Sequence, residues 1–112
     1  MKAIYPHKKS KYGAEKATFN GRTYDSRREC EYAQTLEWRR RAGEIDIVIP
    51  QYRLGLSVCG VHIADYYVDF KVFLPDGTVE FHEVKGYETA DWKLKWLMAK
   101  AIYSDVKFVL IK

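Results

Sequence analysis

The sequence contains little cysteine, histidine or proline, and it has no apolar run of membrane-spanning length. Its two cysteines, Cys30 and Cys59, form no C-x-x-C pair, and its three histidines lack the companions that a zinc site requires. No secretory signal opens the chain. These absences exclude disulfide-rich scaffolds, zinc modules and membrane proteins. We therefore expect a reducing cytoplasm and free thiols, although the sequence leaves a single disulfide open.

The composition is that of one packed domain with a basic charge. The 112 residues are 47% hydrophobic and 15% aromatic, which allows only a small core, so we expect modest stability or help from dimerisation. The net charge of +4 is compatible with a polyanionic partner, but many basic proteins bind no nucleic acid. The positions of the charges are therefore more informative than their sum.

The chain divides into a lysine-rich start and one domain. We expect a basic N-terminal arm over residues 1–18 and a single domain over residues 19–112. At the start of that domain, Asn20-Gly21 predicts a tight turn between two short strands.

The rest of the domain alternates between helical and strand-like patterns. Ser26 and Glu29 form a capping-box pattern, which predicts a helix that runs to about Ala42. Further strands are predicted at 45–49, 61–74, 78–85 and 106–111, and a second helix from Thr89 or Asp91 to about Tyr103. Pro50 is expected to interrupt the first of these strands. The order helix, three strands, helix, strand predicts an α/β fold with a mixed sheet flanked by two helices.

The turn at residues 75–77 sets which side chains face each other across a hairpin. Its Pro-Asp-Gly sequence suits a three-residue loop made of a type I turn and a left-handed glycine. Counting outward from that loop, Asp69 lies directly opposite Glu83, with Cβ atoms about 4.5–5.5 Å apart, and Lys85 shares their face. A two-residue turn would instead place Asp69 opposite Val84 and break the group.

Two carboxylates at this separation repel each other unless a cation lies between them. Oxygen ligands suit Mg²⁺ or Mn²⁺ rather than zinc, and the Lys85 ammonium adds a positive group beside them. Such a trio can bind a metal, orient a water and stabilise a pentacovalent phosphorus. An exposed hairpin with an ordinary cross-strand pair of Asp69 and Lys85 fits the same residues, and the residues alone leave both interpretations open.

Glu29 is a third candidate acid. It belongs to the stripe of the first helix that should face the sheet, together with Tyr32, Ala33 and Leu36. A buried charge in that position needs a partner. Glu29 therefore either closes the capping box only or also serves the metal site.

Five short stretches, in a fixed order over about residues 11–111, carry a family resemblance. They are Lys11-Tyr12-Gly13, Tyr24-Asp25-Ser26-Arg27-x-Glu29, Tyr66-x-x-Asp69-Phe70, Glu83-Val84-Lys85-Gly86 and Lys93-Leu94-Lys95. The aspartate followed by Glu-x-Lys resembles the PD-(D/E)XK nuclease superfamily, and the order of predicted elements is similar to its restriction-endonuclease-like αβββαβ core. More closely, the chain resembles a phage and prophage family catalogued as domain of unknown function 1064.

The resemblance implies a role for each residue of the candidate site. Asp69, Glu83 and the main-chain carbonyl of Val84 would ligate Mg²⁺, for which Mn²⁺ can substitute, and Lys85 would orient or activate the attacking water. Glu29 would act on the metal directly or through water. The chain departs from the common pattern at Val68, where a proline often precedes the aspartate, and at Ile49, where a polar residue often precedes Pro50.

Basic side chains predict where DNA lies. On the second helix, we expect a core stripe of Leu94, Leu97, Met98 and Ala101, and a second face of Trp92, Lys93, Trp96, Lys100 and Tyr103 that suits phosphate contact and base stacking. Lys93 and Lys95 follow the catalytic strand closely and are expected to contact phosphates, as is Lys100. Trp96 is explained more simply by a dimer contact.

Further candidates for DNA contact are Arg39 and Arg40 at the end of the first helix, and Lys9 and Lys11 in the arm. Cations also complement the dipole at a helix C-terminus, so the arginines do not require DNA. His82 is expected on the face opposite Glu83, in a structural role.

The resulting hypothesis is a Mg²⁺-dependent DNA endonuclease, phage-encoded and therefore in the host cytoplasm. The resemblance to the superfamily implies that it leaves a 5′-phosphate and a 3′-hydroxyl. The chain has no room for a separate sequence-reading domain, so we expect it to recognise branched DNA, such as a Holliday junction. Cutting two strands implies a homodimer. Two alternatives stay open, namely a non-catalytic nucleic-acid-binding protein and a repair or restriction-type nuclease that acts on linear duplex or single strands.

Overall fold

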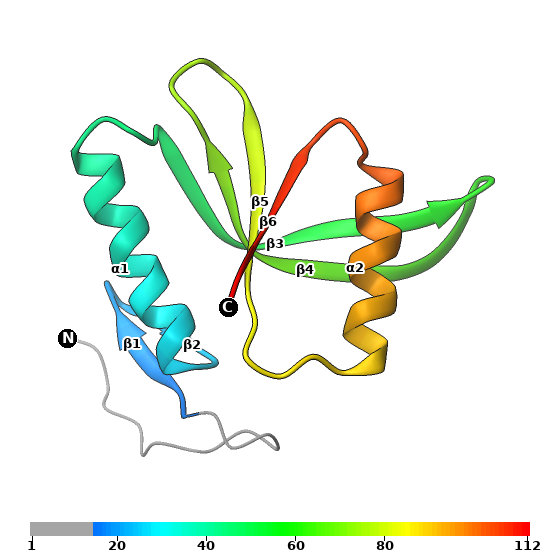
Figure 1. Ribbon diagram of the computed structural model, residues 1–112, viewed down its shortest axis with the longest axis horizontal. Helices are drawn as coiled ribbons and strands as arrows, with labels where there is room; N and C mark the ends of the chain where they lie inside the picture. The colour runs from blue at the N-terminus through cyan, green and yellow to red at the C-terminus, as the bar shows by residue number, and fades with distance from the viewer. Residues whose placement is uncertain (1–14) are drawn as a thin grey trace.

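A four-stranded mixed sheet forms the centre of the computed structural model, which describes residues 15–112 (Figure 1). Its elements, in chain order, are β1 (Ala17–Phe19), β2 (Arg22–Tyr24), α1 (Arg27–Arg41), β3 (Ile47–Val58), β4 (Val61–Phe73), β5 (Val79–Val84), α2 (Ala90–Ile102) and β6 (Lys107–Ile111). The sheet order is β3-β4-β5-β6, with β5 and β6 parallel and the other neighbours antiparallel. The expected mixed α/β fold, with helix, three strands, helix and strand in succession, is confirmed.

The two helices pack against different clusters of the core. The β1–β2 hairpin and α1 cover a cluster that includes Leu36, Phe70 and Val72. Helix α2 covers a second cluster that includes Leu54 and Val68. In Figure 1, α1 and the hairpin accordingly lie on one side of the sheet strands, and α2 lies on the other side, beside the far half of β3 and β4.

Both helices begin where the sequence predicts. The Ser26 hydroxyl accepts a hydrogen bond from the Glu29 N–H at 3.0 Å, which caps α1. The Thr89 hydroxyl accepts from the Trp92 N–H at 3.1 Å, which caps α2 and excludes Asp91 as the cap. Gly43 follows α1 with a φ of +82°, the left-handed conformation that ends many helices.

The β4–β5 hairpin has the predicted three-residue loop. The Leu74 N–H donates to the Thr78 carbonyl at 2.9 Å, and Gly77 has a φ of +90°. Phe70 consequently pairs with His82 in the ladder. This is the register in which the next pair outward is Asp69 and Glu83.

The expectation that Pro50 interrupts the first strand is wrong. Pro50 pairs with Phe70, and β3 continues beyond it to Val58. A proline lacks the N–H that a ladder uses, but it is tolerated on an edge strand. Because β3 is the edge of the sheet, Pro50 leaves the pairing intact.

At Asp69, the side chains of strand β4 switch from packing under α2 to packing under α1. Residues two apart in a strand normally share a face, yet Val68 belongs to the cluster under α2, whereas Phe70 belongs to the cluster under α1. The partner strand changes at Gln51, a non-glycine residue with a φ of +54°. The ladder with β5 begins only at Phe70, so β4 leaves β5 at Asp69.

Of the expected core stripe of α2, only Met98 packs against the core; Leu94, Leu97 and Ala101 are exposed, so the stripe is wrong at those positions. The helix buries Trp92, Trp96 and Ala99, and Tyr103 at its end is half-buried, whereas Leu94 and Leu97 are 62% and 61% exposed. The Trp96 ring packs against Phe108 at 5.4 Å instead of serving a dimer contact. Burying an indole ring removes more apolar area from water than burying a leucine side chain. The face of α2 that carries the tryptophans therefore packs against the sheet.

Three smaller expectations concern the thiols, the N-terminal lysines and membrane-spanning helices. Cys30 is buried and Cys59 is exposed, and both thiols are free as expected. Lys9 and Lys11 lie outside the described residues. Within residues 15–112, no helix is long and apolar enough to cross a membrane.

The orientation of α2 predicts unequal effects of two substitutions on stability. Trp96→Ala should lower the free energy of unfolding by about 3–5 kcal/mol, because it empties a buried ring position. Leu97→Ala, the control on the exposed face, should change it by about 0.5 kcal/mol or less. Urea denaturation measures both, and a larger loss for Leu97→Ala than for Trp96→Ala would contradict the packing.

Candidate functional site

The candidate site lies at the point where β4 leaves β5. The Asp69 N–H donates to Oε1 of Glu83 at 3.3 Å, and the Val84 N–H donates to Oδ2 of Asp69 at 2.8 Å. Asp69 is 8% exposed and Glu83 is 4% exposed. The proximity of the two acids, predicted from the hairpin register, is therefore confirmed.

Lys85 joins this pair from the end of β5. Its Nζ lies 3.9 Å from Oε2 of Glu83 and 5.1 Å from the centre of the Trp92 ring. The Lys85 N–H donates to the Ile111 carbonyl at 2.9 Å, so the parallel pairing with β6 fixes the backbone at this position. The lysine side chain is one-quarter exposed, so its ammonium group is partly open to solvent beside the acids.

Glu29 reaches the same site from the first turn of α1. Nε2 of Gln51 donates to Oε2 of Glu29 at 2.8 Å and approaches Oδ1 of Asp69 at 3.4 Å. The Glu29 and Asp69 carboxyl groups lie close enough for each to shift the pKa of the other. Glu29 therefore does more than close the capping box, since its carboxyl group meets the acid that the hairpin supplies.

Sequence reasoning missed Gln51. A side chain in the left-handed region of φ costs free energy, and such residues concentrate at functional sites. Gln51 adopts this unfavourable conformation opposite Asp69, where its side-chain amide bridges Glu29 and Asp69. No motif marked it, because the bridge depends on the change of face in β3 and β4.

Sequence reasoning also assigned no role to Tyr66. The Trp92 indole N–H donates to the Tyr66 hydroxyl at 3.0 Å, and that hydroxyl is hydrogen-bonded to the Glu83 carboxylate. The chain of donors orients Glu83 from the α2 side. The alternation of β4 gave a signal for Tyr66, since its ring lies on the buried face, but the contact with Trp92 required the correct rotation of α2.

Burial dominates the electrostatics of the acids. It raises the pKa of Glu83 to about 8, and the neighbouring Asp69 charge adds to the shift. Burial raises the pKa of Glu29 to about 8 as well, again with a contribution from Asp69. The pKa of Asp69 rises to about 6, because burial outweighs the opposing hydrogen bond from Val84 and the charge of Lys85.

The buried carboxyl groups of the site therefore outnumber the cationic side chains beside them. Three buried carboxyl groups have one ammonium group beside them, and the free carboxylate lone pairs are oxygen donors of the kind that Mg²⁺ prefers. Within residues 15–112, no three His, Cys, Asp or Glu side chains are grouped as a metal site. Mg²⁺ commonly takes one or two carboxylates together with water and substrate oxygens, so the Asp69 and Glu83 carboxylates fit that ion.

The expected DNA contacts divide into two groups. Lys93 is exposed, and its charge acts together with that of Lys85 to lower the pKa of Glu88, while Nζ of Lys95 donates to the Asp65 carbonyl at 3.3 Å. Nζ of Lys100 lies 5.7 Å from the centre of the Trp96 ring, further along α2. Of the three lysines, Lys93 is thus the best placed beside the site.

The two arginines lie at the far end of α1. Arg39 is paired with Glu44 at 3.1 Å, and Arg40 with Glu37 at 2.9 Å. Ten residues of helix, about 15 Å, separate Arg39 from Glu29. The structure therefore does not bring these side chains to the acids.

His82 has the structural position that was expected. Its Nδ1 lies 2.6 Å from the Tyr32 hydroxyl, and its Nε2 lies 2.9 Å from Oε1 of Glu80. Both partners lie on the α1 side of β5. Burial lowers the pKa of His82, which keeps the ring neutral.

The raised pKa of Glu29 predicts how the stability of the metal-free protein depends on pH. A carboxyl group with a pKa of about 8 in the native state and about 4.5 when unfolded holds its proton longer in the native state, so stability falls as pH rises from about 5 to 8. Glu29→Gln should therefore raise the melting temperature at pH 8 in EDTA by about 5 °C. The exposed Glu31→Gln on the same helix should leave it unchanged. Thermal unfolding at both pH values measures the effect, and a lower melting temperature for Glu29→Gln would contradict it.

Comparison with known proteins gives one match. No curated protein and no solved structure matches the chain. Residues 9–112, nearly the whole sequence, match the family model described as Protein of unknown function (DUF1064). The chain therefore belongs to the DUF1064 family.

Proposed function

We propose that this protein is a Mg²⁺-dependent DNA endonuclease of the PD-(D/E)XK superfamily. The observation that carries the proposal is the meeting of Asp69, Glu83 and Lys85 where β4 leaves β5, with Asp69 hydrogen-bonded to Glu83 and Lys85 beside it. The element order and the mixed sheet support a restriction-endonuclease-like arrangement. In this proposal, the divergence of β4 from β5 gives a phosphodiester access to the acids.

Asp69, Glu83 and the Val84 carbonyl would hold the metal in this proposal. Their burial favours a bound cation, because ionising the carboxyl groups without one costs free energy. When bound, Mg²⁺ supplies Lewis-acid stabilisation of the charge that develops on the phosphoryl oxygens. Glu29 would contribute through Gln51 or through water, since its carboxyl group is bridged to Asp69 by the Gln51 amide.

The side chains would divide the hydrolysis between them. Lys85 orients the attacking water in line with the phosphorus–O3′ bond and stabilises the extra negative charge of the transition state. The water oxygen bonds to phosphorus as the bond to O3′ breaks, which leaves a 5′-phosphate and a 3′-hydroxyl. Glu29, with a pKa of about 8, is suited to accept the water proton near neutral pH. Tyr66 holds Glu83 in place by the hydrogen bond to its carboxylate.

The proposed substrate is branched DNA. The described domain consists of the β1–β2 hairpin, the sheet and two helices, none of which is a separate module for reading a long base sequence. Recognition of a branch requires shape and phosphate contacts instead, and Lys93 is positioned to provide such contacts. Cutting two strands of a junction requires two sites, so a homodimer is part of this proposal.

A cleavage assay tests the proposed activity. Wild-type protein should cut a four-way junction faster than linear duplex or single strands, with Mg²⁺ or Mn²⁺ and not in EDTA. Asp69→Ala and Lys85→Ala should each lower the cutting rate at least about a hundredfold while DNA binding persists, because each removes a group that acts in the transition state. Asp65→Ala, on the same strand and paired with Arg53, is the matched control and should cut normally.

Cutting that survives both Asp69→Ala and Lys85→Ala would refute the site. Pure wild-type protein that binds DNA and cuts no substrate would favour a binding module instead. Preference for linear duplex or single strands would favour a repair or restriction-type nuclease, and light scattering would decide whether the chain is a dimer.

Metal binding can also be tested without activity. Mg²⁺ at a hundredfold excess over its Kd should raise the free energy of unfolding by about 2.7 kcal/mol, because it binds only the native state. The increase should be larger at pH 8 than at pH 5, since protons compete for the acids whose pKa values are raised. Asp69→Asn should abolish the increase, whereas Asp65→Asn should keep it. Equal stabilisation of the two variants would contradict the metal assignment.

A further inference from the structure

Arg28, in the first turn of α1, is an exposed cation without an acidic partner. The preceding residue, Arg27, pairs with Glu15 at 3.3 Å. Within residues 15–112, no ion pair engages the Arg28 guanidinium. Residues 1–14 contain no aspartate or glutamate, so that part of the chain has no carboxylate side chain to offer. The guanidinium is therefore available to an anion from outside the chain.

The position of Arg28 does not stabilise the helix that carries it. The N-terminus of a helix bears a partial positive charge, which favours acidic side chains and disfavours cations in the first turn. Glu29 is the acidic residue of that turn, but its carboxyl group accepts a hydrogen bond from Gln51 in the candidate site. The unfavourable charge of Arg28 is therefore left uncompensated, and an anionic ligand at this place would compensate it.

The Arg28 guanidinium lies against Gly86, the residue that directly follows Lys85. A Cβ atom at Gly86 would lie 3.4 Å from Nη1 of Arg28, whereas the other five glycines in residues 15–112 have no such neighbour within 4 Å. Gly86 has no left-handed φ, so its small size rather than its conformational freedom is used here. In Figure 1, the start of α1 accordingly lies beside the segment that leaves β5. Arg28 thus reaches from α1 to the segment behind the site lysine.

Other cations surround the same segment. Nζ of Lys112 pairs with Glu88 at 2.9 Å, so the carboxylate of this segment is already engaged. The charges of Lys93 and Lys85 also lower the pKa of Glu88. Cationic side chains from α1, the end of β5, α2 and the end of the chain therefore meet at the segment after β5, and Lys85 connects them to the acids.

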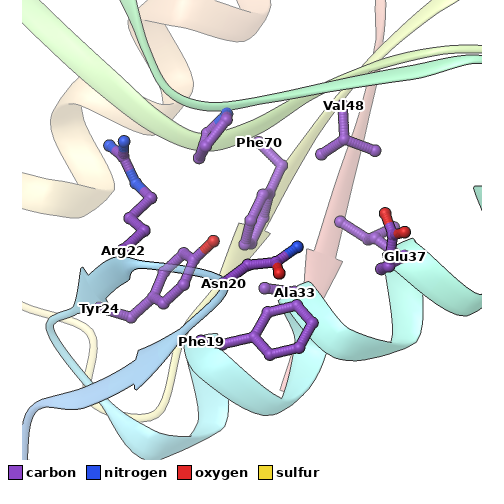
Figure 2. Close-up of a pocket in the computed structure, with 10 residues that line it drawn as sticks. Phe19, Asn20, Arg22, Tyr24, Ala33, Glu37, Val48 and Phe70 are labelled. Carbon is purple, nitrogen blue, oxygen red and sulfur yellow. The ribbon is translucent and has the colours of Figure 1, made fainter. Parts of the chain in front are cut away.

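The inward face of α1 beyond its first turn is occupied by the core. Figure 2 shows Ala33, one turn after Glu29, close to Phe19 of the hairpin and Phe70 of β4. These three side chains belong to one hydrophobic cluster. A DNA strand that reaches the acids therefore meets α1 at its first turn, where Arg28 is exposed.

We propose that Arg28 binds a phosphate of the DNA strand next to the phosphate at the acidic site and so positions that strand for cutting. This inference rests on the proposed function and adds a positioning residue to it, because Arg28 contacts no reacting atom. A guanidinium presents parallel N–H donors that match two oxygens of one phosphate. The phosphate also supplies the negative charge that the start of α1 lacks.

The first test measures binding of a four-way DNA junction by fluorescence anisotropy at several salt concentrations, in EDTA to prevent metal-dependent cutting. Arg28→Ala should weaken binding about tenfold and lower the slope of log K against log salt by about one, since one phosphate contact is lost. Arg28→Lys should restore the slope but only part of the affinity, because an ammonium group keeps the charge and lacks the planar fork. Arg27→Ala is the matched control and should leave the slope unchanged, because Arg27 is engaged by Glu15.

The second test locates the contact on the DNA. Single phosphates of the junction are replaced in turn by uncharged methylphosphonate. Wild-type protein should lose affinity at one phosphate where Arg28→Ala loses nothing further, because the contact is already absent. Gly86→Val fills the space beside the guanidinium, so it should weaken binding on its own and add nothing to Arg28→Ala.

Unchanged affinity and slope for Arg28→Ala would overturn the inference. An equal effect of Arg27→Ala would do so too, as would equal losses by wild type and Arg28→Ala at every methylphosphonate, or no junction binding by wild type. These outcomes are separate from the fate of the proposed function. Junction cutting with normal binding by Arg28→Ala would leave a nuclease without this contact. A phosphate-specific loss in a protein that cuts nothing would leave the contact in a binding module.

Discussion

The burial of three neighbouring carboxyl groups is the constraint on which the rest of this structure depends. Asp69 and Glu83 come together because the loop after β4 fixes the register, and α1 adds Glu29. Desolvation raises the pKa of each acid, so the native chain holds protons there or binds a cation in their place. Such an arrangement costs stability, and proteins keep costly groups of this kind where chemistry requires them.

The β3–β4 ribbon changes its course at this cluster. At Gln51 and Asp69 the two strands exchange their inward-facing sides. The part of β4 that precedes Phe70 does not pair with β5. The same change allows Val68 to pack under α2 while Phe70 packs under α1. One local irregularity therefore separates β4 from β5 at the acids and also places Phe70 in the core under α1.

Helix α2 illustrates where periodicity alone is insufficient. The leucine stripe that includes Leu94 and Leu97 has nearly the same helical spacing as the stripe of Trp92, Trp96 and Ala99, on the other side of the helix. Both stripes satisfy a helical pattern, so only the areas that they bury distinguish them. The choice also matters for the site, because Trp92 donates to the Tyr66 hydroxyl that orients Glu83.

The sequence by itself determined the order of elements, both helix caps and the pairing of Asp69 with Glu83, because caps, turns and hairpin registers depend on residues close together in the chain. Only the tertiary structure decided the continuity of β3, the bridge formed by Gln51 and the rotation of α2. These features depend on which strand lies at the edge of the sheet, where the strands diverge and which face buries the larger area. Each of those features depends on segments that are far apart in sequence, so local sequence patterns do not predict it.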